Sequence, residues 1–186
     1  QIFDDLKDET RRMNRLTGNL LTLARPDSEG IEMIREAFAI GPVLEHVKRV
    51  MGTLAENKGV KLNVLSNENL VLHADRDRIS QLLMILVDNG IKFTPAGGEV
   101  RVSVERKMNG SVILSVADTG VGLSPEDRKK IFERFYRVDK ARSREDGGAG
   151  LGLSIAAWIV GAHGGKIEVF ANEESGSIFR VILPAE

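Results

Sequence analysis

The chain has 186 residues, 42% of them hydrophobic and 28% charged, a composition typical of one globular domain with an appended element. A formal net charge of −1 gives no indication of nucleic acid or anionic lipid as a partner, and the lack of cysteine excludes disulfides, thiolate chemistry and a cysteine zinc site. No apolar run approaches the roughly 20 residues of a membrane helix, so we expect no membrane contact by this chain. It begins at Gln1 within a helical pattern, and we therefore expect a piece of a longer protein.

A helix with a heptad-like seam opens the chain. The seam advances in alternating steps of four and three, which is typical of a coiled coil or helix bundle, through Ile2, Leu6, Glu9, Met13, Leu16, Leu20 and Leu23. One such helix cannot bury its stripe alone, so it packs on partner helices or folds back onto its own domain. Pro26 and Gly30 indicate its end. We therefore predict a boundary between 1–30, a helix with its linker, and a domain at 31–186.

Strands and helices of moderate length fill the predicted domain. The pattern predicts strands at 31–40, 60–65, 70–73, 99–107, 111–117, 166–170 and 177–183. It predicts helices at 41–56 and 75–93, a short helix beginning near Ser124, and another from about Gly150 to Ala162. Asn109-Gly110 is a strong hairpin signal between two of the strands. Mostly antiparallel strands with helices on one face make the fold class α+β, a two-layer sandwich.

The helix at 75–93 carries polar side chains where its apolar stripe continues. The stripe starts with Ile79, Leu82 and Leu86. Continued in steps of three and four, it reaches Asn89 and Phe93, which predicts Asn89 on the buried face. A buried amide costs about 1–3 kcal/mol unless it is hydrogen-bonded or coordinating. Lys92 can reach the same region, so the set suits metal, phosphate and base; the alternative is a core amide beside a surface lysine.

A carboxylate and two glycines follow the strand at 111–117. Because side chains alternate along a strand, Asp118 extends the inward-facing row of that strand. A carboxylate there accepts hydrogen bonds, and the exocyclic amine of adenine is a natural donor. Gly120 and Gly122 would let the backbone turn beneath the base. The alternative is an ordinary Asp-Thr-Gly turn.

A second glycine cluster precedes the helix that ends near Ala162. Gly148, Gly150 and Gly152 would place unsatisfied N–H groups and the positive helix end where phosphate oxygens could sit, although glycines also serve close helix packing. The segment before it, 132–146, mixes five basic with four acidic residues. Arg134 or Arg137 would therefore act singly on a terminal phosphate; otherwise the segment is a solvated loop.

In this order the pieces resemble the catalytic, ATP-binding domain of bacterial sensor histidine kinases, in the wider gyrase B, MutL and heat-shock ATPase superfamily. The matching motifs are QLLMILVDNGIKFTP, DTGVGL, IFERFYRVD and GGAGLGLSI. The resemblance covers about 31–186 and implies a Bergerat-type ATP-binding fold. The segment ETRRMNRLTGNLLTLAR is similar to the second helix of the family's dimerisation and phosphotransfer domain.

The resemblance implies a role for each matching residue. Asn89 would bind Mg²⁺, Lys92 and Arg137 would contact phosphates, and these three would act in catalysis. Phe93 would lie by the adenine of ATP or ADP and Asp118 would bind its amine. The base pocket would be shaped by Gly120 and Gly122, the lid anchored by Phe132 and Phe135, and the lid hinge and phosphate cradle formed by Gly148, Gly150, Leu151 and Gly152.

Three positions depart from the family pattern. Ile85 stands where related kinases carry asparagine and related ATPases a glutamate that activates water, which weighs against hydrolysis as the main activity. Gly90 replaces the usual alanine, at a cost to the helix of roughly 1 kcal/mol. Ala149 stands where threonine is common, so a hydroxyl near the phosphates is lost.

The phosphate acceptor of the family is also missing. The histidines are His46, His73 and His163, and none precedes the acidic residue and downstream proline that mark the family's phosphorylated histidine. We interpret all three as structural or surface residues. The helix that carries the acceptor would lie before Gln1.

The resemblance implies that the intact protein transfers the γ-phosphoryl group of Mg·ATP to a histidine and thence to a response-regulator aspartate, as a homodimer and as the cytoplasmic part of a membrane-anchored sensor. This chain should bind ATP or ADP without phosphorylating itself. The alternatives are a hydrolysing ATPase of the same fold and a nucleotide- or partner-binding module without catalysis.

Overall fold

A computed structural model describes residues 33–65, 70–138, 150–173 and 175–185. The predicted N-terminal helix, its boundary near Gly30 and the glycine at position 148 lie outside the described residues.

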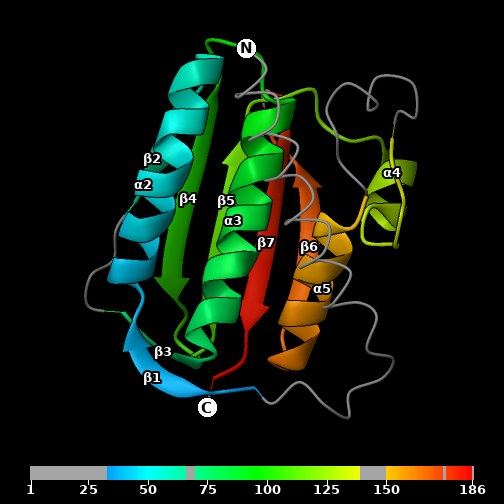
Figure 1. The fold of residues 1–186 in the computed structure, drawn as a ribbon. Helices are drawn as coiled ribbons and strands as arrows, with labels where there is room; N and C mark the ends of the chain where they lie inside the picture. Colours follow the sequence, from blue (N-terminus) through cyan, green and yellow to red (C-terminus); the bar gives the residue numbers. More distant parts are fainter. Residues whose placement is uncertain (1–32, 66–69, 139–149, 174, 186) are drawn as a thin grey trace, which may run out of the picture.

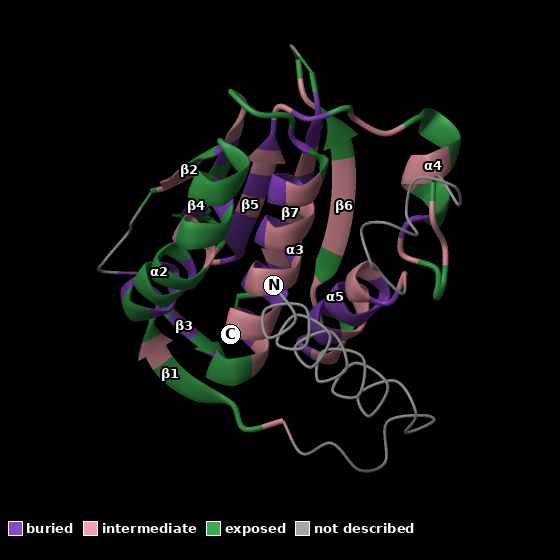
Figure 2. Cartoon of the chain, turned by 45° about the horizontal axis from the view of Figure 1, so that its top comes forward, coloured by how far each residue is buried: buried purple, intermediate pink, exposed green. Residues whose placement is uncertain are grey.

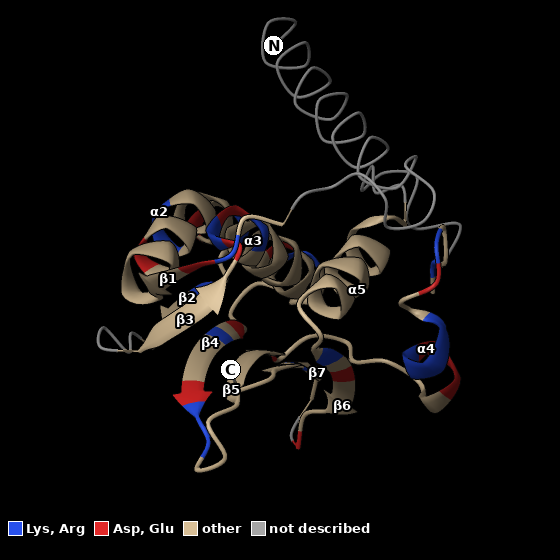
Figure 3. Cartoon of the chain, turned by 90° about the horizontal axis from the view of Figure 1, so that it is seen from below, with Lys and Arg blue, Asp and Glu red and all other residues tan. Residues whose placement is uncertain are grey.

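The described chain is a two-layer sandwich of helices on a sheet (Figure 1). The sheet has five strands in the order β2 (Lys61–Val64), β4 (Glu99–Arg106), β5 (Val112–Asp118), β7 (Ser177–Leu183) and β6 (Lys166–Ala171). Only one face is covered by helices, namely α2 (Gly41–Lys58), α3 (Arg76–Phe93) and α5 (Gly152–Ala162) (Figure 3). The short helix α4 (Pro125–Lys130) lies to the side (Figure 1). The α+β fold class predicted from sequence is confirmed.

The strands are mostly antiparallel, as predicted, and their pairing adds two details that the sequence did not specify. β2 runs parallel to β4, while the other neighbours in the sheet are antiparallel. A separate two-stranded sheet pairs β1 (Glu36–Ala39) with β3 (Val71–Ala74). The strand predicted at 31–40 is therefore too long. Ile34 N–H donates to the Asp75 carboxylate at 3.2 Å and Arg35 N–H donates to the Met33 carbonyl at 3.1 Å, so these backbone donors bind a side chain and a local carbonyl instead of a strand partner.

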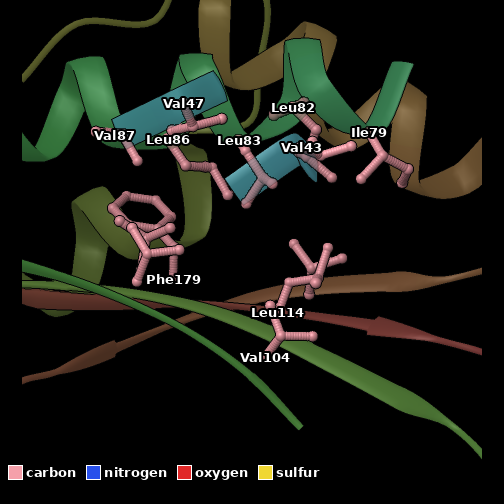
Figure 4. Close-up of a cluster of buried hydrophobic side chains, with 14 of the residues drawn as sticks. Val43, Val47, Ile79, Leu82, Leu83, Leu86, Val87, Val104, Leu114 and Phe179 are labelled. Carbon is pink, nitrogen blue, oxygen red and sulfur yellow. The ribbon is translucent and has the colours of Figure 1, made fainter. Parts of the chain in front are cut away.

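The core lies between the helices and the sheet, and α3 is its centre (Figure 4). Asp75 caps the start of α3 by accepting a hydrogen bond from Arg78 N–H at 3.0 Å. The buried face of the helix consists of Ile79, Leu82, Leu83, Leu86, Val87, Gly90 and Ile91. Across the layer, Leu114 of β5 and Phe179 of β7 meet it, both from the alternating positions that face the helices.

The apolar face of α2 is narrower than its sequence indicates. Leu44 and Val47 are fully buried, but Val50 and Leu54, which the periodicity assigns to the same face, are 46% and 43% exposed. Because α2 lies at the side of the helical layer, beside α3, only part of its apolar stripe can contact the core (Figure 2). Helical periodicity alone would therefore place Val50 and Leu54 on a buried face, whereas the structure leaves both side chains exposed.

These exposures predict different effects of two leucine substitutions on one helix. Leu44→Ala should lower the free energy of unfolding by about 2–5 kcal/mol, because it leaves a cavity in the core. Leu54→Ala should change it by less than about 0.5 kcal/mol. Urea unfolding of both variants measures the difference; equal losses would contradict the placement of α2.

Candidate functional site

Asp118, the last residue of β5, is the most buried charged group of the predicted site. Its side chain is 5% exposed, and Oδ1 accepts hydrogen bonds from Gly120 N–H at 2.9 Å and Ser177 N–H at 3.2 Å. With Oδ1 engaged by two backbone amides, Oδ2 is the oxygen left to meet a ligand. Burial raises the pKa of Asp118, and the two backbone hydrogen bonds oppose that rise. The arrangement presents one carboxylate oxygen in a fixed direction.

The turn after Asp118 requires its glycines. A Cβ on Gly120 would lie 2.5 Å from the Phe93 carbonyl oxygen, closer than any side chain tolerates. Gly122 has a φ of +71°, a conformation that favours glycine, and a Cβ there would lie 3.2 Å from the Gly176 carbonyl oxygen. The turn is thus held against the end of α3 on one side and the β6–β7 loop on the other.

The β6–β7 loop supports Asp118, and sequence reasoning missed its role. Asn172 donates a side-chain N–H to the Asp118 carbonyl at 2.9 Å, and Ser177 supplies one of the two amides on Oδ1. A Cβ on Gly176 would lie 2.1 Å from the Asp118 carbonyl oxygen, so only glycine fits there. In the sequence, the Ser-Gly pair before the last strand indicates a loop. It does not indicate that this loop contacts Asp118 at the end of β5.

Asn89 lies where α3 meets the start of α5. Its side chain is half-buried, so the prediction of a buried face holds only in part, and Nδ2 donates to the Ile85 carbonyl at 2.9 Å. Oδ1 is thereby the acceptor that Asn89 offers to a ligand. A Cβ on Gly152, the first residue of α5, would lie 3.9 Å from Nδ2 and 3.4 Å from Ile85 Cγ2. The structure therefore brings Asn89 and Gly152 together.

Lys92 and Phe93 form the end of α3. The Lys92 ammonium lies 5.4 Å from the centroid of the Phe93 ring, a cation–π geometry. Phe93 is 50% exposed, so the apolar stripe of α3 does not continue to it as the periodicity predicted. The helix ends at Phe93.

The start of α5 lacks a side-chain cap among the described residues. The N-cap residue, Leu151, makes no capping hydrogen bond through its side chain, which makes the first N–H groups of the helix candidates to bind an anion. Gly150, just before it, has a φ of +70°. The end of α3 and the end of β5 lie at the same end of the sandwich, and the start of α5 lies beside Ile85 and Asn89 of α3 (Figure 1). The predicted adenine and phosphate contacts therefore share one edge of the fold.

The base of the predicted lid is pinned on both sides. Phe135 N–H donates to the Gly150 carbonyl at 3.0 Å, which joins the two ends of the segment 139–149, itself outside the described residues. Phe132 packs edge-on against Phe179, with centroids 6.5 Å apart. The Phe135 side chain is 64% exposed, so this residue anchors the lid base through its backbone. Arg137, half-buried, follows on the same segment.

A small polar network attaches this segment to α4. The Tyr136 hydroxyl donates to Asp127 Oδ1 at 2.8 Å, and the Ser124 hydroxyl donates to Asp127 Oδ2 at 2.6 Å. The hydrogen bond from Ser124, and then that from Tyr136, lowers the pKa of Asp127. The same bond to Asp127 raises the pKa of Tyr136. The aromatic segment is thereby fixed to the helix before it.

The three histidines lie apart from this edge, and they differ in how far they are buried. His163 is buried, and its Nε2 accepts a hydrogen bond from Asp75 N–H at 3.0 Å while Nδ1 lies 2.8 Å from the Ile159 carbonyl oxygen. It connects the end of α5 to the start of α3, which confirms a structural role. His46 and His73 are exposed.

The described residues contain neither a cluster of metal ligands nor a membrane-spanning helix. None of the described residues form a group of three His, Asp or Glu side chains able to hold a metal ion. A magnesium ion that keeps waters and takes substrate phosphates needs fewer protein ligands, and the Asn89 amide oxygen fits that use. No described helix has the length and apolarity to cross a membrane.

The raised pKa of Asp118 predicts a pH-dependent cost to stability. The folded protein keeps the Asp118 proton to a higher pH than the unfolded chain, whose value is near 3.8, so this group makes the free energy of unfolding fall as pH rises through that interval. Asp118→Asn keeps an oxygen for the two amides and does not ionise. Its stability relative to the native chain should therefore increase between about pH 4 and about pH 7, as measured by urea unfolding; a constant difference would contradict this.

Known proteins resemble the chain over nearly its whole length. Sensor protein SrrB of Staphylococcus aureus (strain NCTC 8325 / PS 47) is 36% identical over 177 residues, which cover 95% of this chain and 30% of that protein. The crystal structure of full-length ShkA in complex with AMPPNP is 31% identical with a TM-score of 0.83, over 97% of this chain and 37% of that one. Histidine kinase ThkA in complex with response regulator protein TrrA is 27% identical with a TM-score of 0.76, over 95% of this chain and 49% of that one.

A family model described as histidine kinase-, DNA gyrase B- and HSP90-like ATPase matches residues 74–186. The match runs from the end of β3 to the end of the chain, so it contains Asn89, Asp118 and the start of α5. The chain therefore belongs to the histidine kinase-, DNA gyrase B- and HSP90-like ATPase family, as the ATP-binding catalytic domain of a two-component sensor histidine kinase.

Proposed function

We propose that the chain holds Mg·ATP along the edge formed by α3, β5 and α5, and that the longer protein transfers its γ-phosphoryl group to a histidine outside this chain. The observation that carries the proposal is Asp118, a buried carboxylate with one oxygen fixed by two backbone amides and the other left for a donor. The exocyclic amine of adenine is a donor of the right kind.

The remaining residues suit the other parts of the nucleotide. Asn89 Oδ1 would hold Mg²⁺, which supplies charge neutralisation between the phosphates, and Lys92 would contact a phosphate. Phe93 would lie against the base. Arg137 would reach the γ-phosphate, and the open N–H groups at the start of α5 would cradle phosphate oxygens with Gly148, Gly150, Leu151 and Gly152.

In this reaction the domain has to orient the γ-phosphate and to compensate its negative charge. The bond from the γ-phosphorus to the bridging oxygen breaks as the bond to a histidine nitrogen forms, and ADP leaves with the electron pair. The acceptor nitrogen attacks with its own lone pair, so no residue of this chain has to generate the nucleophile. Orientation of the γ-phosphate and compensation of its charge are then the contribution of the domain.

Ile85 favours phosphotransfer over hydrolysis. Its side chain is half-buried against the start of α5, one turn before Asn89 on α3. An apolar side chain can neither accept a proton from water nor orient it. A hydrolysing ATPase of the same fold is therefore the weaker alternative. A nucleotide- or partner-binding module without catalysis is distinguished by whether an added acceptor is phosphorylated.

The partners of the longer protein follow from the same proposal. The chain corresponds to 30% of the length of SrrB, so most of such a protein would lie outside it. We propose a homodimer held by helices that include 1–25, and a response-regulator receiver domain as the next acceptor. ThkA has been crystallised with the response regulator TrrA, which supports a partner of that class. The domain would form the cytoplasmic part of a membrane-anchored sensor.

Asn89→Ala should separate the metal contribution from base binding. Without its amide oxygen the site loses a Mg²⁺ ligand, so the affinity for ADP in magnesium should fall about tenfold or more while metal-free ADP binding changes little. Titration calorimetry with and without magnesium measures both. The control is Asn57→Ala, an exposed asparagine of α2. Unchanged affinity in magnesium would remove Asn89 from the metal site.

Phosphotransfer should require a histidine that this chain lacks. Incubated with γ-labelled ATP, the purified chain should incorporate no label on histidine and release phosphate at a negligible rate. Adding the acceptor helix of a homologous kinase, joined to the chain or as a separate chain, should yield phosphohistidine. Label on His46, His73 or His163 would contradict the assignment of these residues; steady phosphate release would favour the ATPase.

A further inference from the structure

The C-terminal end of α3 is capped by a lysine from another helix. The last four carbonyls of an α-helix have no partner within the helix. In α3, the Lys58 ammonium donates to the Ile91 carbonyl at 2.9 Å and also to the Lys92 carbonyl. Lys58 is the last residue of α2, and α2 and α3 end at the same end of the helical layer (Figure 1). One cation thus binds two of the exposed carbonyls of α3.

The other terminal carbonyls of α3 also have partners. Thr94 donates to the Gly90 carbonyl from its N–H at 3.1 Å and from its hydroxyl at 2.6 Å. Val121 N–H, in the turn after Asp118, donates to the Phe93 carbonyl at 3.3 Å. Thr94 directly follows α3, and Val121 belongs to the turn of the candidate site. Lys58 is the donor that α2 supplies to this helix end.

The turn that carries Lys58 is locked to the turn that follows α3. Gly97 N–H donates to the Gly59 carbonyl at 2.8 Å, and Lys61 N–H donates to the Gly98 carbonyl at 2.9 Å. Gly59 ends α2 with a φ of +68°, which directs the chain into β2. These backbone contacts fix the start of the Lys58 side chain relative to α3. The lysine therefore acts from a defined position.

We propose that Lys58 is a positioning residue for the nucleotide site: by capping Ile91 and Lys92 it fixes the last turn of α3 and thereby directs the Lys92 ammonium to the nucleotide phosphates. This inference rests on the proposed ATP-binding function. Its consequence is specific, because Lys92 is assigned to phosphate, whereas the adenine contacts come from Asp118 and from Phe93, whose carbonyl is held by Val121 N–H and not by Lys58.

Charge adds to the effect of the cap. The C-terminal end of a helix carries a partial negative charge, which would repel phosphate groups beside the last turn of α3. The Lys58 ammonium compensates that charge at the two carbonyls it binds. A purely structural lysine would support the fold equally for a ligand with or without phosphates. A positioning lysine favours the ligand with phosphates.

The test compares Mg·ADP with adenosine, which has no phosphate. Lys58→Met should weaken Mg·ADP binding about three- to tenfold and adenosine binding less than about twofold, as measured by calorimetry on the full chain. Lys58→Arg should restore most of the affinity for Mg·ADP, because it keeps a cation that can donate to carbonyls. Lys48→Met, which changes an exposed lysine of α2, is the matched control and should have no effect.

A double-mutant cycle identifies the route through Lys92. In a Lys92→Met background, Lys58→Met should cause a clearly smaller loss of Mg·ADP affinity, because only the charge effect, which does not pass through the Lys92 side chain, remains. Equal losses for ADP and adenosine, an unchanged loss in the Lys92→Met background, or no loss at all would each overturn the inference. If the methionine variant fails to fold, Lys58→Gln takes its place in the same cycle. A native chain that binds no Mg·ADP would instead overturn the proposed function itself.

Discussion

Two backbone amides on one oxygen of Asp118 are the constraint on which the rest of the site depends. They come from two separate segments, one from Gly120 in the turn that follows and one from Ser177 at the start of the last strand. A buried carboxylate is costly unless it is hydrogen-bonded, so these amides make the burial tolerable. They also select which oxygen faces a ligand. The turn after Asp118 and the β6–β7 loop must therefore adopt conformations that direct these two N–H groups at the Asp118 carboxylate.

The same turn fixes the position of α3 at its far end. Val121 N–H donates to the Phe93 carbonyl. Because a Cβ on residue 120 would clash with the same carbonyl oxygen, only glycine fits at that position. At the other end of the helix, Asp75 caps the first turn and accepts from Ile34 N–H, while His163 binds the Asp75 amide. The long helix is thus held at both ends by polar contacts and along its length by the core. A helix so held can present Asn89 in one orientation.

Periodicity and turn chemistry predicted the elements well, because those signals are local. The extent of α3 was predicted within a residue or two, and the inward position of Asp118 follows from strand alternation. Failures occurred where a distant contact decides the outcome. Val50 and Leu54 are exposed because α2 lies at the side of the layer, and Ile34 leaves the strand because Asp75 competes for its amide.

The site itself was predicted unevenly for the same reason. Asn89 interrupts an apolar stripe, and this interruption can be seen in the sequence of one helix. Lys58 is a lysine at the end of a helix, which is a common pattern, and nothing in the sequence near it indicates that it binds two carbonyls of another helix. Nor does the sequence show that Asn172 supports Asp118 from the β6–β7 loop. Side chains that contact a ligand tend to break a local pattern. Residues that position them usually obey it.

Gly90 shows how such positioning limits stability. Glycine within a helix costs about 1 kcal/mol relative to alanine, yet a Cβ at this position would lie 3.1 Å and 3.3 Å from the two methyl carbons of Val100 and 3.8 Å from the Asp118 side chain. The glycine lets α3 approach the sheet where β5 delivers Asp118. An alanine would gain helix propensity but press on Val100, whose side chain would have to give by a few tenths of an ångström, while its contact with Asp118 would be an ordinary one. The departure from the usual alanine is therefore tied to close packing beside the site.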